Sequence, residues 1–184
     1  MITNVIITDN FYSNPDGVRN FALSQPFSVT GNFPGKRTIS HLTPDVKETI
    51  QSIVWNAGGA VTDWFENDGY TGAFQLTTAA DRSWVHSDHF NTWAGVCYLN
   101  PDAPYTGGTG LFRHRATGAV RAGELTTGYE AQDMTKWDLY DTLGNIYNRL
   151  VLYRGDLFHS SLDYFGSDLY TGRLFQVFFF STQY

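Results

Sequence analysis

The stretch WVHSDHFNTWAGVCYLN, residues 84–100, sets a histidine and a carboxylate two positions apart, just before a strongly apolar run. In a β-strand, residues i and i+2 point to the same face, so His86 and Asp88 are predicted to face one spot. An imidazole and a carboxylate that converge in this way form part of a metal site. A His-x-Asp triplet alone also arises by chance, so a metal site needs a third ligand.

A third ligand is available in NRLVLYRGDLFHSS, residues 148–161, where an apolar strand and a Gly-Asp turn are followed by His159. Two histidines and one carboxylate form the facial triad of non-haem Fe(II) oxygenases, which leaves three coordination positions open for substrates and O₂. Zinc more often takes a closed tetrahedral set, and the lone Cys97 does not support a thiolate site. The pattern therefore favours iron on His86, Asp88 and His159.

A buried charge is predicted at Arg173, which begins the very apolar run RLFQVFFF, residues 173–180. An unpaired guanidinium inside a β-barrel is costly, so this side chain needs an anionic partner. A carboxylate suits the planar fork of arginine better than it suits lysine. Arg173 therefore predicts a carboxylate ligand inside the fold.

With these motifs, the chain resembles the Fe(II)/2-oxoglutarate-dependent oxygenases, in particular the prolyl-hydroxylase-like branch. The resemblance covers roughly residues 73–181 and rests on their order: HSD (86–88), VCYLN (96–100), GGTGLF (107–112), GDLFHSS (155–161) and GRLFQVFFF (172–180). It implies a mainly β fold, the double-stranded β-helix or jelly roll, with flanking N-terminal helices. The connection LDYFGSDLYTG, residues 162–172, is longer than in many relatives.

The same resemblance implies the ligands of the site. Fe(II) would lie on His86, Asp88 and His159, and the C5 carboxylate of the cosubstrate 2-oxoglutarate on Arg173. A second cosubstrate contact would come from Tyr98 or Gln75, each displaced by one residue from the position expected of a tyrosine in prolyl hydroxylases. The carboxylate of Asp88 argues against the halogenating relatives, which have a small residue there.

The implied activity is a dioxygenase that uses O₂ to hydroxylate an organic substrate, either a peptidyl side chain such as proline or a small molecule. Two alternatives stay open: a non-catalytic β-sandwich module whose aromatics bind a ligand, and a cupin-type metal enzyme that does not use 2-oxoglutarate. Neither alternative needs an arginine facing the metal from the last strand. The substrate and the oligomeric state are not specified by the sequence.

The composition limits the classes of partner. The 184 residues suit a single domain, and a net charge of −6 without a basic cluster disfavours nucleic acid and anionic membranes. One cysteine rules out an internal disulfide and suggests a reducing compartment. The N-terminus lacks the features of a signal peptide, and no apolar run approaches about 20 residues. We therefore expect a cytoplasmic protein.

Local patterns predict two parts within residues 1–184. Residues 1–70 should hold an opening strand and two helices, one capped by Ser13 or Asn14 and one by Thr43. Residues 71–184 should hold the β core, with an insertion at about 116–146 that covers the pocket and is partly helical. The expected strands of the core are 73–78, 83–88, 93–99, 110–114, 149–153, 156–160 and 173–181.

Overall fold

The structure is a computed structural model that describes residues 2–66, 70–127 and 130–183. Its helices are α1 (Pro15–Ser24) and α2 (Pro44–Gly58). Its strands are β1 (Val5–Thr8), β2 (Lys36–Ser40), β3 (Ala60–Asp63), β4 (Ala73–Thr77), β5 (Trp93–Tyr98), β6 (Thr109–His114), β7 (Trp137–Leu143), β8 (Leu150–Arg154), β9 (His159–Ser161) and β10 (Arg173–Gln183). Short 3₁₀ turns lie at Tyr105–Gly107, Ala122–Glu124 and Met134–Lys136.

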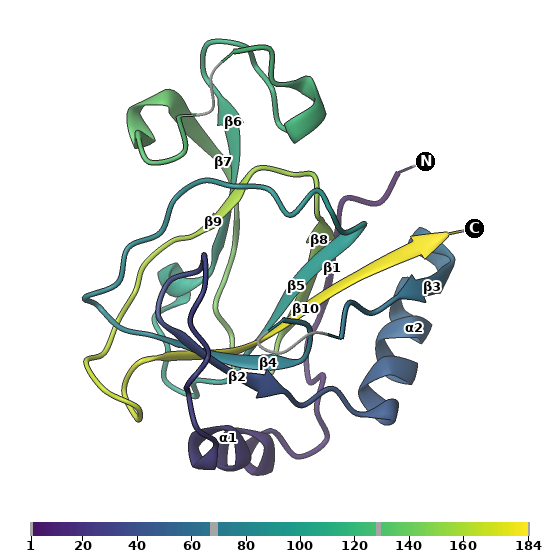
Figure 1. The fold of residues 1–184 in the computed structure, drawn as a ribbon, viewed down its shortest axis with the longest axis vertical. Coiled ribbons are helices and arrows are strands. Elements are labelled where there is room, and N and C mark those ends of the chain that lie inside the picture. Colours follow the sequence, from purple (N-terminus) through teal and green to yellow (C-terminus); the bar gives the residue numbers. More distant parts are fainter. Residues whose placement is uncertain (1, 67–69, 128–129, 184) are drawn as a thin grey trace.

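The strands form two antiparallel sheets that face each other (Figure 1). Within the described residues, the larger sheet has the order β1-β8-β5-β10-β4-β2, with β3 paired to the far end of β10. The smaller sheet has the order β7-β6-β9. Two facing antiparallel sheets with flanking helices make the predicted double-stranded β-helix.

Strand β10 contains the last apolar run of the chain, and residues 173–180 are buried on both faces of the sheet. Leu174, Phe178 and Phe180 belong to the cluster that packs beneath the helices, together with Ile50 and Val54 of α2. The alternate residues of β10 point to the opposite face of the sheet, as the period of a strand requires. That inner face, which begins at Arg173 and continues through Phe175, Val177 and Phe179, turns toward the smaller sheet.

Both helices begin where capping chemistry predicts. The Asn14 side chain accepts a hydrogen bond from the Gly17 amide at 3.0 Å, and Pro15 follows it. The Thr43 hydroxyl accepts one from the Val46 amide in the same way.

Among the described residues, no helix is long and apolar enough to span a bilayer.

One of the expected strands is absent. Residues 83–88 form no strand, and only His86 makes an isolated bridge, to His159. The part expected to be partly helical contains the 3₁₀ turn Met134–Lys136, which is followed by strand β7, paired with β6. The cover over 116–146 stays a prediction: none of its described residues lines the cavity between the sheets, and residues 128–129 lie outside the described part.

The Gly107–Gly108 pair lets β6 begin close to the end of β7. A Cβ atom added to Gly108 would lie 1.9 Å from the Leu143 carbonyl oxygen, a backbone atom that cannot rotate away. We expect Gly108→Ala to destabilise the protein by about 1–3 kcal/mol, as overpacking does. Gly123→Ala is the matched control, since its added methyl group would meet no atom within 4 Å. Urea denaturation measures both, and equal midpoints would contradict this account of the turn.

Candidate metal centre

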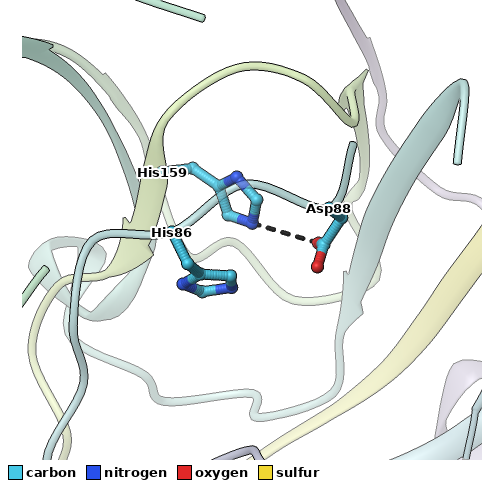
Figure 2. Close-up of side chains that lie close together, drawn as sticks. All are labelled: His86, Asp88 and His159. Atoms are coloured by element: carbon cyan, nitrogen blue, oxygen red, sulfur yellow. Dashed lines mark ion pairs between the residues drawn. The ribbon is translucent and has the colours of Figure 1, made fainter. Parts of the chain in front are cut away.

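The three predicted metal ligands meet inside the fold. Their ligating atoms all lie within 4.8 Å of one another, and Figure 2 shows His86, Asp88 and His159 turned toward a common point. The backbones of the two histidines are joined by a pair of hydrogen bonds, 2.9 and 2.8 Å long. The distal histidine therefore lies beside the His-x-Asp segment although 73 positions separate His86 from His159 (159 − 86).

The turn before His159 also holds Asp88. The Asp88 amide donates to the Gly155 carbonyl at 2.7 Å, and the Gly155 amide donates to the Thr92 carbonyl at 3.0 Å. A Cβ atom on Gly155 would lie 2.3 Å from the Asn91 carbonyl oxygen, so glycine is required for this close approach. The Gly-Asp turn after β8 thus fixes the backbone of one ligand and leads directly to another.

Backbone carbonyls select the tautomer of both histidines. Nδ1 of His86 lies 3.0 Å from the Trp84 carbonyl oxygen, and Nδ1 of His159 lies 2.9 Å from that of Leu157. A carbonyl oxygen can only accept, so each Nδ1 carries the proton and each neutral ring has its lone pair on Nε2. Metal-ligating histidines are oriented by outer hydrogen bonds of this kind.

The contact between His159 and Asp88 requires a positive charge. Nε2 of His159 lies 3.2 Å from Oδ2 of Asp88, the contact drawn as a dashed line in Figure 2. In the tautomer that the Leu157 carbonyl selects, both atoms are acceptors and would repel each other. Only a proton or a metal cation between them makes the arrangement favourable, and Nε2 of His86 is close enough to share the metal.

The charge states suit metal binding. Burial and the neighbouring His159 lower the pKa of His86 to about 4, so its imidazole is neutral and able to ligate at neutral pH. Burial opposes ionisation of Asp88, but a hydrogen bond and a positive charge from His159, when a proton is present on its Nε2, outweigh this effect, and the pKa of Asp88 lies below its ordinary value. The site therefore offers a neutral imidazole at His86 and an ionised carboxylate at Asp88.

Arg173 is fully buried, with 0% of its surface exposed. Nε donates to the Gly107 carbonyl at 2.7 Å and Nη2 to the Gly108 carbonyl at 3.3 Å. Nη1 has no hydrogen-bond partner among the described residues, and no carboxylate in that part of the chain forms an ion pair with Arg173. A buried arginine with an unused N–H group is the feature that a carboxylate ligand would complete.

The metal ligands border a cavity of about 450 Å³ between the two sheets. That volume falls within the ~300–1,000 Å³ range of ligand pockets. Polar residues of both sheets, and Tyr164 from the connection between β9 and β10, also line it: Arg37, Gln75, Thr109, Tyr153, Ser161 and Tyr164. The cavity thus offers a metal site and further polar groups in one space.

The two candidates for a second cosubstrate contact lie on the inner face but in different surroundings. The Tyr98 hydroxyl bonds to the Thr109 hydroxyl at 2.8 Å, and the tyrosine ring lies 5.5 Å from Cζ of Arg173. Gln75 accepts from Nε of Arg37 at 2.8 Å and donates to the Pro34 carbonyl at 2.7 Å. Tyr98 is therefore beside Arg173, while Gln75 holds a second arginine at the cavity wall.

Arg37 is a site residue that the sequence did not reveal. It is 7% exposed, and its Cζ lies 4.0 Å from the centre of the Phe33 ring. Burial lowers the pKa of Arg37 to about 10, and the carboxylate of Asp88 partly offsets this effect, so Arg37 stays charged. The only sequence signal was a basic residue in a segment where a Pro-Gly turn, not a strand, was expected.

Comparison with known proteins identifies the sequence family of this chain. A model described as a family of unknown function, DUF6445, matches residues 2–126, which is more than half of the chain. The chain belongs to this family. The matched region includes His86 and Asp88, whereas His159 and Arg173 lie beyond it. No curated protein matches the sequence.

Solved structures establish the fold to which this DUF6445 member conforms. HygX from Streptomyces hygroscopicus, with nickel and 2-oxoglutarate bound, has a TM-score of 0.67 at 8% identity, covering 99% of this chain and 84% of that chain. The non-haem, α-ketoglutarate-dependent epimerase SnoN from nogalamycin biosynthesis has a TM-score of 0.59 at 11% identity, covering 96% and 78%. A Pseudomonas putida prolyl-4-hydroxylase has 0.51 at 15%, covering 98% and 93%. The predicted fold, a mainly β double-stranded β-helix, is thereby confirmed.

Proposed function

We propose that this protein is an Fe(II)- and 2-oxoglutarate-dependent oxygenase that hydroxylates an organic substrate. The observation that carries the proposal is the pair of facing acceptors, Nε2 of His159 and Oδ2 of Asp88, which need a proton or a metal cation between them, with His86 close enough to share the metal. The incompletely bonded guanidinium of Arg173 on the inner face of the same barrel adds a place for the cosubstrate. Neither a non-catalytic sandwich nor a cupin that does not use 2-oxoglutarate explains Arg173.

The metal and the cosubstrate would be held by different residues. His86, Asp88 and His159 would hold Fe(II), and Arg173 would bind the C5 carboxylate of 2-oxoglutarate. When bound, these two groups supply the oxidation, in which 2-oxoglutarate, O₂ and a C–H substrate give succinate, CO₂ and the hydroxylated product. The apolar inner face, including Val177 and Phe179, would limit access of water to the site.

Tyr98 and Gln75 would support the site through other groups. The Tyr98–Thr109 hydroxyl pair lies next to Arg173 and would orient the distal carboxylate. Gln75 would position Arg37, since Gln75 already bonds to that guanidinium and to the Pro34 carbonyl. Both roles follow from the inner face that these residues share.

The substrate is a small molecule or a peptidyl side chain, and the comparisons include both kinds of ligand. One HygX structure contains hygromycin B, and a prolyl hydroxylase from Trichoplax adhaerens, at 13% identity and a TM-score of 0.52, is in complex with a peptide fragment. In this chain, Phe33, Trp84 and Phe90 line the cavity near the metal ligands. Phe90 is 80% exposed, so the substrate would meet an aromatic surface at this wall.

The experiment is to supply Fe(II) and 2-oxoglutarate to the protein and then admit O₂. We expect succinate to form only when metal, 2-oxoglutarate and O₂ are all present, and faster with a true substrate from a screen of peptides and small molecules. Mass spectrometry of the screened mixture would show a gain of one oxygen atom in that substrate. A protein that binds both ligands but forms no succinate under O₂, with or without the screen, would be a binding module instead.

A further inference from the structure

Two more buried hydroxyl groups near Arg173 have no partner. The Tyr164 hydroxyl and Oγ1 of Thr77 are both inaccessible and form no hydrogen bond within the described residues, as is also true of Nη1 of Arg173. The Tyr164 ring centre lies 5.9 Å from Cζ of Arg173. Thr77 is the direct cross-strand partner of Arg173, so the two side chains leave the sheet on one face. Three unsatisfied polar groups in one buried place indicate a polar ligand.

Tyr164 comes from the connection 162–172, between β9 and β10, and that connection packs on the start of β6. The Phe165 ring lies so close to Gly107 that a Cβ atom there would be 2.8 Å from it. The Gly107 carbonyl also accepts a hydrogen bond from Nε of Arg173. Gly107 therefore contacts both Arg173 and the connection that contains Tyr164.

The rest of the connection is held by its own hydrogen bonds. The Gly166 carbonyl accepts from the Ala79 amide at 2.9 Å, which ties the connection to the end of β4. Gly166 itself has φ +71°, where a side chain would be strained and would collide with the Thr171 carbonyl. Asp168 then accepts from the amides of Tyr170 and Thr171, both at 2.9 Å. Residues 166–171 therefore form an ordered turn, held by hydrogen bonds, in the connection that places Tyr164 at the cavity.

We propose that Tyr164 donates its hydroxyl hydrogen to the distal carboxylate of 2-oxoglutarate, beside the guanidinium of Arg173, and that Thr77 supplies a further donor. This inference rests on the proposed function. A carboxylate has about four acceptor sites, so the unused N–H of Arg173 does not satisfy it alone. Tyr164 lines the cavity, and the packing of its neighbour Phe165 against Gly107 fixes this part of the connection before a ligand binds.

The test is titration of nickel-loaded protein with 2-oxoglutarate and with 2-oxopentanoate, which has a methyl group in place of the distal carboxylate. We expect Tyr164→Phe to weaken 2-oxoglutarate binding by about tenfold, as for the loss of one hydrogen bond to a charged group. Binding of 2-oxopentanoate should be unchanged. Tyr170→Phe is the matched control from the same connection, because the Tyr170 side chain is 70% exposed. Thr77→Val should show the same selective loss, to a smaller extent.

The outcomes separate this inference from the proposed function. Wild-type protein that binds 2-oxoglutarate no better than 2-oxopentanoate would contradict the proposed function itself. A wild-type preference that Arg173→Ala removes and Tyr164→Phe leaves intact would overturn only the role of Tyr164. Equal weakening of both ligands by Tyr164→Phe would mean a structural role, and would overturn it as well. A crystal structure with nickel and 2-oxoglutarate gives an independent answer, since the Tyr164 oxygen should lie about 2.5–3.0 Å from the carboxylate.

Discussion

Replacing His159 with alanine is expected to lower metal affinity by more than about a hundredfold, because even the loss of an outer hydrogen-bond partner of a ligand costs 10–100-fold. The variant keeps His86 and Asp88, which leaves one imidazole and one carboxylate on the cation. Isothermal titration of nickel or anaerobic Fe(II) into the metal-free protein measures the change.

His114→Ala is the matched control. Like His159, which is 3% exposed, His114 is buried, at 2%, but it packs on Trp137 and bonds to Thr117 away from the cavity. Both variants remove a buried imidazole, so both should lose some stability. Only His159→Ala should lose the metal. Unchanged nickel affinity in His159→Ala, or an equal loss in His114→Ala, would contradict the assignment of the triad.

Replacing Arg173 with alanine is expected to weaken 2-oxoglutarate binding by about ten- to a hundredfold, since a charge-assisted hydrogen bond contributes about 1.5–3 kcal/mol. Arg173→Lys should recover only part of this, because an ammonium group cannot reproduce the planar fork. Metal affinity should change little in either variant, because Arg173 is not a ligand. Titration of 2-oxoglutarate into nickel-loaded protein gives all of these constants.

Stability provides a second measurement on the same residue. A buried cation without an anionic partner is costly, so the ligand-free Arg173→Met variant should be no less stable than the wild type, although it loses two bonds to the Gly107 and Gly108 carbonyls. Arg19→Ala is the control for the loss of side-chain hydrogen bonds, since Arg19 also donates to two backbone carbonyls, those of Leu99 and Tyr170.

Unaltered 2-oxoglutarate affinity in Arg173→Ala would remove the main argument for this cosubstrate.

The metal triad was predictable because its chemistry is local. The His-x-Asp spacing needs only a locally extended backbone, and His86 forms an antiparallel bridge to His159 although residues 83–88 form no regular strand. The Gly-Asp turn predicted a chain reversal just before His159, and the Gly155 carbonyl in this turn accepts a hydrogen bond from the Asp88 amide. Neither inference depended on how distant strands align.

The rest of the site depended on strand register, which the sequence did not contain. Cys97 and Leu76 occupy the positions where a tyrosine was first expected, and both face the helices. Tyr98 and Gln75, one residue away, both pair with Phe175 and therefore lie on the inner face of the sheet. A shift of one residue exchanges the two faces of a strand, so only the structure could decide.

Strands β2, β3 and β7 were not predicted from the sequence. In β7, Trp137, Tyr140 and Leu143 are spaced three apart, which also suits a helix, and residues 139–142 are all exposed, so the strand lacks alternating burial. Strand β2 is short and polar at its start, and it follows a Pro-Gly turn. Missing β2 meant missing Arg37, the residue that it carries to the cavity.

We propose that the protein binds Fe(II) and 2-oxoglutarate together between its two sheets. The most direct test is anaerobic addition of 2-oxoglutarate to the Fe(II)-loaded protein, followed by visible absorption. We expect a weak charge-transfer band that saturates with one equivalent of 2-oxoglutarate and is absent with succinate or without Fe(II). A protein that binds Fe(II) but shows no such band at saturating 2-oxoglutarate would contradict it.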